Sequence, residues 1–114
     1  MKQAGQIVVT LFPYTDLSGQ KLRPVLLLRQ TSPRFDDWLA CMVSSQLQQA
    51  EPGLDELVMP ADADFADSGL KAPSVLRLTR LAVLEGASLI GCVGEISHAR
   101  LLTVRERLAA WLTG

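Results

Sequence analysis

The sequence predicts one mainly β domain with a single C-terminal α-helix, and three observations lead to this prediction. Residues 6–96 hold five or six short apolar runs separated by turn residues, a spacing that favours a small barrel over a sandwich. Residues 97–113 change to a helical period. The chain has 114 residues, 48% hydrophobic and 20% charged, which is enough for one small core. We therefore expect residues 1–114 to form one domain.

The strands are expected where β-branched and apolar residues lie between turn residues. Residues 61–72 contain three aspartates and are closed by Gly69, so we interpret them as an irregular, solvated loop. The expected strands cover residues 6–12, 24–28, 38–46, 56–59, 74–84 and 88–95, with the short fourth strand at a sheet edge.

The helix is expected to begin after Ser97, whose side-chain oxygen can accept a hydrogen bond from a free N–H group of the first turn. Beyond Ser97, apolar residues recur at helical spacing and form one stripe. The stripe consists of Leu101, Leu102, Val104, Leu108, Ala109 and Leu112.

Two of the expected strands are apolar on both faces, which points beyond a single copy of the chain. Residues 25–28 and 38–43 lack the alternation of a strand with one solvated face. The helix can cover part of the second face, and a second copy of the chain would cover the rest, including Trp38 and Trp111. We therefore expect a homodimer; the alternative is that the helix covers everything.

Composition narrows the function classes. A net charge of −1 argues against a strongly basic nucleic-acid wrapper, although a local basic patch remains compatible with it. Cys41 and Cys92 lie in apolar runs without CxxC spacing, so we interpret them as reduced core residues of a cytoplasmic protein, with a disulfide as the alternative. With His98 as the only histidine, a metal-ligand cluster is not expected. No signal peptide and no membrane-spanning run are expected.

Arg23 is the first candidate for a functional residue. Pro24 follows it and forces extended backbone geometry on Arg23 at the start of a strand. A fixed planar cation beside hydroxyl groups suits phosphate recognition, although ordinary strand ends share this pattern. The loop before Arg23 supplies the polar side chains Tyr14, Thr15, Asp16 and Ser18.

Four segments together resemble the MazF/PemK family of toxins from bacterial toxin–antitoxin pairs. They are GQIVVTLFPYTDLSGQKLRPVLLL, CMVSSQ, GLKAPSVLRLTRLAVL and VGEISHARLLTVRERLAAWL, and they cover nearly the whole chain. The resemblance implies a small SH3-like barrel with a C-terminal helix that forms a homodimer. It also implies a cofactor-independent endoribonuclease that cuts single-stranded RNA sequence-selectively and is neutralised by a small antitoxin.

The same resemblance implies a catalytic pair. In this family the arginine of the Arg-Pro pair acts with a threonine or serine at the end of the third strand, which here are Arg23 and Ser44. Serine in place of threonine keeps the hydroxyl but loses the methyl group that restricts its rotamer. Alternation along the strand is expected to turn Ser45 to the opposite face.

The chemistry of RNA cleavage sets its own requirements for the catalytic groups, independent of the resemblance. Metal-free RNA cleavage uses the 2′-hydroxyl as nucleophile and needs a base, an acid and stabilisation of the charged phosphorane. One histidine, expected at the surface, cannot supply both proton transfers. Arg23 would then stabilise charge and could donate a proton, and Ser44 would hydrogen-bond the phosphate. Neither is a base at pH 7, so the base must come from another group.

Further residues are expected to contact RNA from loops and strand ends. Besides Tyr14, Thr15, Asp16 and Ser18, these are Gln46, Lys71, Ser74 and Arg77. Arg77 and Arg80 should lie on opposite faces of one strand, so at most one would face the groove. Two other functions stay open: a CcdB-like gyrase poison, and an inactive protein-binding barrel.

Overall fold

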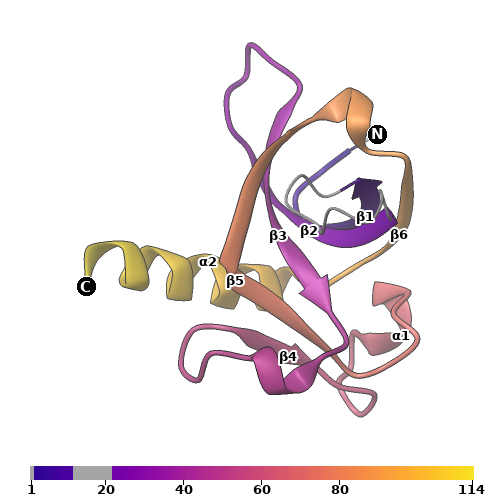
Figure 1. The fold of residues 1–114 in the computed structure, drawn as a ribbon, viewed down its shortest axis with the longest axis vertical. Coiled ribbons are helices and arrows are strands. Elements are labelled where there is room, and N and C mark those ends of the chain that lie inside the picture. Colours follow the sequence, from indigo (N-terminus) through magenta and orange to yellow (C-terminus); the bar gives the residue numbers. More distant parts are fainter. Residues whose placement is uncertain (1, 12–21) are drawn as a thin grey trace, which may run out of the picture.

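The computed structural model describes residues 2–11 and 22–114. Six strands form one antiparallel sheet in the order β4-β5-β3-β2-β1-β6, and helix α2 packs against it (Figure 1). The strands are β1 (Gln6–Leu11), β2 (Leu22–Gln30), β3 (Asp37–Ser44), β4 (Glu56–Val58), β5 (Ser74–Glu85) and β6 (Gly91–Glu95). The helices are α1 (Phe65–Ser68) and α2 (His98–Thr113), with short 3₁₀ turns η1 (Leu47–Gln49) and η2 (Gly86–Ser88).

The predicted fold class, mainly β with one C-terminal helix, is confirmed. The short strand β4 lies at a sheet edge as predicted. Ser97 is the N-cap of α2, because its Oγ accepts the backbone N–H of Arg100 at 3.1 Å. The strand boundaries differ by one to three residues: β2 is longer than expected at both ends, β3 ends at Ser44 and not at Gln46, and β6 begins only at Gly91, since η2 precedes it. The region predicted to be irregular contains the one-turn helix α1.

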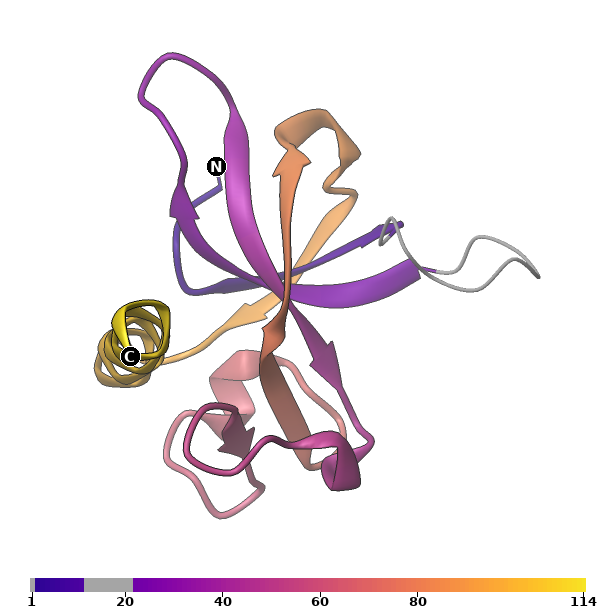
Figure 2. The ribbon, with the colours of Figure 1, turned by 60° about the vertical axis from the view of Figure 1, so that its left-hand side comes forward.

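One face of the sheet forms the main core with α2. The helix contributes Leu101, Val104 and Leu108, all buried. Figure 2, in which α2 is seen nearly end-on, shows the helix beside the twisted sheet. The sheet and its loops contribute Ile7, Leu26, Leu28, Cys41, Val43, Leu54, Val58, Leu76, Leu78 and Ile96.

The other face of the sheet is also buried within the same chain, because the sheet curls onto itself. A second cluster contains Val8, Val25, Leu27, Trp38, Ala40 and Leu84. The Trp38 indole N–H donates to Asp36 Oδ1 at 2.8 Å, so this partly polar ring is also satisfied. Our reason for expecting a dimer was therefore wrong for these strands, since their second face needs no second copy.

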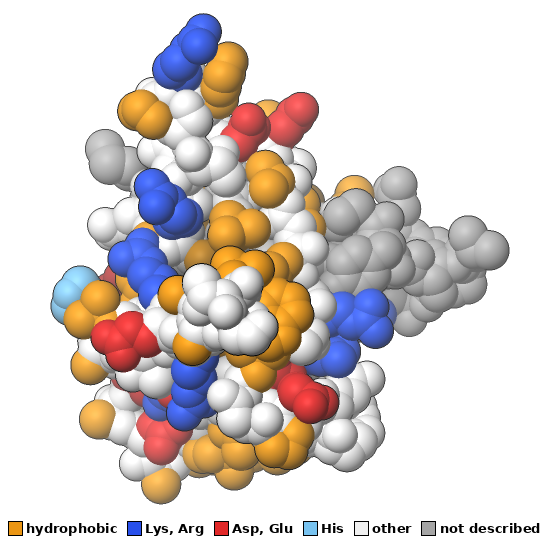
Figure 3. Space-filling model, turned by 90° about the vertical axis from the view of Figure 1, so that its left-hand side faces the viewer, with side chains coloured by type: hydrophobic (Ala, Val, Ile, Leu, Met, Phe, Trp, Pro, Cys, Tyr) orange, Lys and Arg blue, Asp and Glu red, His pale blue; other side chains and the backbone are white. Residues whose placement is uncertain are grey.

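Part of the apolar surface still lies open around the end of α2. The C-terminal half of the helix extends past the sheet (Figure 1), and Trp111 is 52% exposed. Figure 3, which faces this end of the helix, shows hydrophobic side chains (orange) around it with basic groups nearby. The homodimer stays a prediction.

We had expected the acidic loop to be solvated, but this was wrong for two of its carboxylates, which form ion pairs with Arg100 of α2. Asp64 Oδ2 accepts Arg100 Nε at 2.8 Å, and Asp62 Oδ2 accepts Arg100 Nη2 at 2.9 Å. Glu56 of β4 accepts Arg100 Nη1 at 3.2 Å and Arg107 Nη1 at 2.8 Å. The hydrogen bond from Arg100 lowers the pKa of Asp64 to about 2, and the same contact raises the pKa of Arg100. We call these groups the Arg100 clamp.

The two cysteines and the histidine lie in different surroundings. Cys41 is a free thiol in the core, and burial raises its pKa to about 12, which keeps it protonated. Cys92 is also free but exposed on β6, so our prediction of a core residue was wrong there. His98 is an exposed residue of the first turn of α2, as predicted. Within the described residues, no helix combines the length and apolarity needed to cross a membrane.

Candidate functional site

A polar groove opens where the second apolar face of the sheet ends. It has a volume of about 620 Å³ and lies over the adjoining ends of β2, β3 and β5, with the chain after α1 as its far wall. Its lining is Arg23, Pro24, Met42, Val43, Ser44, Ser45, Gln46, Gln49, Leu70, Lys71, Ala72, Ser74, Arg77 and Arg80.

Strand register brings the candidate catalytic pair together. Val25 on β2 pairs with Met42 on β3 at the end of this ladder, and Arg23 and Ser44 each follow two residues beyond that pair. On the other side of β3, Met42 pairs with Arg77 of β5. Because side chains two residues apart share a face, Arg23 and Ser44 lie on the face that carries Val25 and Met42. Arg23 of β2 and Arg77 of β5 line the same groove as Ser44.

A bulge in β5 brings a further arginine to the groove. Pairing with β3 jumps from Cys41↔Leu81 to Met42↔Arg77, which leaves residues 78–80 outside the ladder. The Leu78 N–H, which loses its partner on β3, donates instead to Asp55 Oδ1 at 2.7 Å. Because the bulge breaks alternation, Arg77 and Arg80 both line the groove, and our prediction that at most one would do so was wrong.

A small hydrogen-bond network fixes Ser44. Its Oγ accepts the backbone N–H of Gln46 at 3.0 Å and donates to Gln49 Oε1 at 3.2 Å. The same oxygen of Gln49 accepts Arg77 Nη1 at 3.3 Å. The side chain of Gln49 therefore joins the hydroxyl of β3 to the guanidinium of β5.

Two arginine donors in the groove are buried without a partner. The Nε atoms of Arg23 and Arg77 are the buried side-chain polar atoms that lack a hydrogen bond among the residues described. A buried N–H left unpaired is costly, so an acceptor that reached either Nε would relieve that cost. Four cations and no carboxylate belong to the described lining, and the cations are Arg23, Lys71, Arg77 and Arg80. The groove therefore suits a polyanion.

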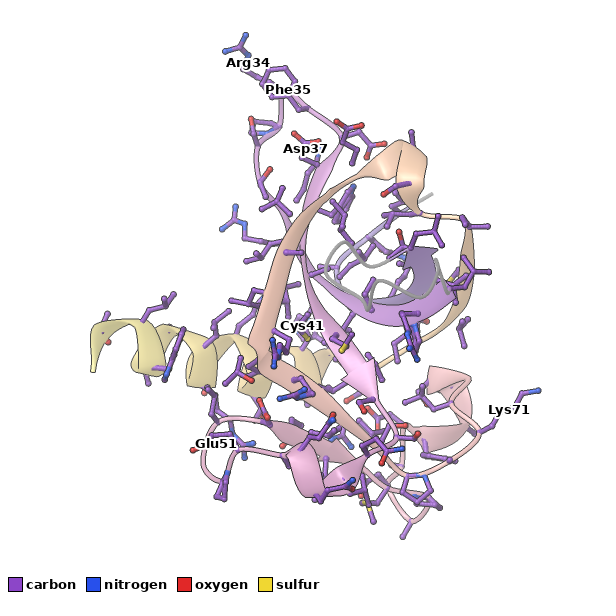
Figure 4. All side chains as sticks on the ribbon, viewed as in Figure 1. Arg34, Phe35, Asp37, Cys41, Glu51 and Lys71 are labelled. Carbon is purple, nitrogen blue, oxygen red and sulfur yellow. The ribbon has the colours of Figure 1, made fainter. Side chains whose placement is uncertain are left out.

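The other predicted contacts are placed unevenly. Gln46 lines the groove with an exposed side chain. Ser74 lines it too, but it is buried and donates to the Ala72 carbonyl at 2.9 Å, so this hydroxyl serves the local turn. Lys71 belongs to the rim, and its side chain reaches away from the fold into solvent (Figure 4). Tyr14, Thr15, Asp16 and Ser18 fall outside the described residues.

Besides the arginines of β5, sequence reasoning misplaced Ser45 and missed Gln49. Ser45 was expected on the opposite face, yet it also lines the groove, because β3 ends at Ser44 and alternation stops there. Gln49 was missed, since nothing in the run LQQ distinguishes one glutamine from the next. Gln49 reaches Ser44 and Arg77 only because the 3₁₀ turn η1 lies against β5 in the fold.

The sequence profile of the PemK-like, MazF-like toxins of type II toxin–antitoxin systems matches residues 3–112. The chain belongs to this toxin family. The match spans all of the groove residues named above and both ends of the sheet. No curated protein matches the sequence significantly.

Solved structures of MazF toxins share the fold. An endoribonuclease in complex with its cognate antitoxin from a mycobacterial species superposes with a TM-score of 0.72 at 16% identity, covering 99% of this chain and 96% of that one. MazF from Deinococcus radiodurans gives 0.71 at 22% identity, covering 99% and 97%. The Mycobacterium tuberculosis toxin MazF-mt6 gives 0.68 at 17% identity, covering 95% and 96%. At these identities the likeness establishes the fold.

Proposed function

We propose that this protein is the toxin of a type II toxin–antitoxin system and acts as a metal-independent, sequence-selective endoribonuclease on single-stranded RNA. The observation that carries the proposal is the groove in which Arg23, Ser44 and Arg77 meet on three adjacent strands. Family membership supports it. A structural neighbour is an endoribonuclease bound to its antitoxin, which is consistent with the same activity here.

The groove offers what RNA cleavage by the 2′-hydroxyl requires at the phosphate. A scissile phosphate placed there takes N–H donors from Arg23 and Arg77, which stabilise the extra charge of the phosphorane. The Ser44 hydroxyl donates to a non-bridging oxygen and fixes the phosphate against β3. No carboxylate or histidine belongs to the described lining, so none of these residues serves as the base that accepts the 2′-proton.

The test is cleavage of one unstructured RNA in the presence of EDTA. Arg23→Ala should lower the rate by about a hundred- to a thousandfold, because it removes a charge-stabilising contact without opening a core cavity. Arg23→Lys should restore little, since an ammonium lacks the planar two-pronged donor geometry. Arg34→Ala is the matched control, because Arg34 is at the tip of the β2–β3 loop (Figure 4). Trapping of gyrase on DNA without RNA cleavage would replace this proposal with the gyrase-poison function.

The proposal implies two protein partners. It also places the protein in the cytoplasm, where the thiols of Cys41 and Cys92 stay reduced. A small antitoxin with an acidic segment would cover the cationic groove, and double-mutant cycles between Arg23 and its carboxylates should then show coupling. A second copy of the chain would cover the open apolar surface around Trp111 and Leu112. Light scattering that finds only monomer at micromolar concentration would remove the dimer.

A further inference from the structure

The side-chain oxygen of Gln49 is the point on which two groove donors converge. Ser44 Oγ lies 3.2 Å and Arg77 Nη1 3.3 Å from Gln49 Oε1. A guanidinium has only donors, so the oxygen and not the nitrogen of the amide must face Arg77. Ser44 Oγ already accepts the Gln46 N–H, so its own proton is available for Gln49.

This arrangement is also how a protein binds a phosphate oxygen. A phosphoryl oxygen accepts a hydroxyl and a guanidinium N–H in the same way, and its charge makes both bonds shorter and stronger. The neighbouring Nε of Arg77 is buried and, among the described residues, unpaired. The neutral amide of Gln49 therefore accepts hydrogen bonds from Ser44 and from Nη1 of Arg77 but none from Nε of Arg77. A phosphate anion has further oxygens that could also accept from this Nε.

We propose that Gln49 is a positioning residue whose Oε1 takes the place of a phosphate oxygen until RNA binds. When a phosphodiester enters, Ser44 O–H and Arg77 Nη1–H transfer their hydrogen bonds from Gln49 to one of its non-bridging oxygens. This inference rests on the proposed function for the identity of the ligand. It adds that Gln49 both aligns the two donors and competes weakly with the substrate for them.

Two substitutions separate alignment from competition. Gln49→Met keeps the length of the side chain but removes the acceptor, so kcat for RNA should fall about tenfold while KM does not rise. Gln49→Glu keeps the acceptor but adds a charge that holds Arg77 more tightly, so KM should rise about tenfold or more. A side chain with only a structural role would not shift the two constants in these separate ways.

Gln48→Glu is the matched control for charge. Gln48 precedes Gln49 on the same 3₁₀ turn and is absent from the groove lining, and its side chain donates to Gln46 Oε1 at 2.9 Å. This variant therefore measures general repulsion of a polyanion together with the loss of that one hydrogen bond. It should change KM by less than about twofold, because exposed charges are screened by salt.

The experiment measures two properties of wild type and the three variants: the affinity for inorganic phosphate, followed by NMR of the arginine N–H groups, and kcat and KM for one unstructured RNA in EDTA. The inference predicts that Gln49→Glu weakens phosphate binding about tenfold relative to Gln48→Glu. Equal phosphate affinity in these two variants, or no phosphate binding by wild type at millimolar concentration, would overturn it.

If wild type cuts no RNA but Gln49→Glu still weakens phosphate binding, the proposed function fails and the role of Gln49 stands. If wild type cuts RNA and Gln49→Met and Gln49→Glu match its kcat and KM, the proposed function stands and this inference falls.

Discussion

Arginines occupy two contrasting settings in this molecule. Arg100 donates through Nε, Nη1 and Nη2 to three carboxylates and to the Leu57 carbonyl, and its side chain is only 12% exposed. Arg23 and Arg77 line the groove, and each keeps a buried Nε that no described residue accepts. The arginine side chain thus has its donors paired within the protein at Arg100, whereas at Arg23 and Arg77 an N–H donor is left without a partner among the described residues.

The difference separates a structural cation from a binding cation. The donors of Arg100 fasten α2 to the loop and the edge strand beneath it, and a ligand could gain little there. The unpaired donors of the groove have already lost water without gaining a protein partner, so an incoming anion meets donors that are partly desolvated.

Replacing the clamp residue should damage stability and spare the chemistry. Arg100→Met should lower the free energy of unfolding by about 3 kcal/mol, because it leaves the partly buried carboxylate of Asp64 without its cation and leaves Glu56 with Arg107 alone. Urea unfolding measures the loss, and Arg34→Met, at an exposed loop tip, should stay within about 0.5 kcal/mol of wild type. RNA cleavage by the folded fraction should be unchanged. A large rate loss at full stability would place Arg100 in the site and remove the contrast.

The clamp should also give stability a dependence on acid. The folded-state pKa of Asp64, about 2, lies below its ordinary value, so this carboxylate stabilises the protein fully above about pH 4. That contribution is lost as the pH falls from about 4 toward 2. Asp64→Asn should therefore cost about 2 kcal/mol at pH 7, and the gap from wild type should close as the pH drops through this window. A gap that stays constant from pH 7 to pH 2.5 would show that the ion pair is not its source.

On the groove side, Ser44 should affect rate without affecting stability. Ser44→Ala should slow RNA cleavage by about tenfold or more, because the donor to the phosphate is lost from a half-buried position. Ser44→Thr should keep or raise the rate, since the hydroxyl stays and the added methyl group restricts its rotamer. Single-turnover cleavage in EDTA measures both variants. If Ser44→Thr is as slow as Ser44→Ala, packing around this residue matters more than its hydroxyl.

Local pattern was sufficient to predict the strands, the helix and the start of the site. Turn residues and apolar runs placed the six strands within a few residues, and the position of Pro24 singled out Arg23 at the mouth of β2. The N-cap at Ser97 followed from its side-chain chemistry. These features depend on neighbours in the sequence, which is why the sequence reveals them.

The remainder depends on contacts between distant residues. Arg77 and Arg80 share the groove only because Asp55, 23 residues before Leu78, captures its N–H and stabilises the bulge. Arg100 and Asp64 are 36 residues apart in the sequence. Nothing near the acidic run reveals this partner, which is why we interpreted the run as a solvated loop. The second apolar face of β2 and β3 is covered by curvature of the whole sheet, and alternation within one strand carries no information about curvature.

The most direct test of the contrast observes the arginine donors themselves. The Nε–H signals of Arg23, Arg77 and Arg100 can be followed by NMR while a single-stranded DNA oligonucleotide is added, since DNA offers phosphates but has no 2′-hydroxyl with which to be cleaved. We expect the signals of Arg23 and Arg77 to shift and to exchange more slowly with solvent, while that of Arg100 stays in place. Unchanged signals from Arg23 and Arg77 at saturating oligonucleotide, or a response from Arg100 alone, would contradict it.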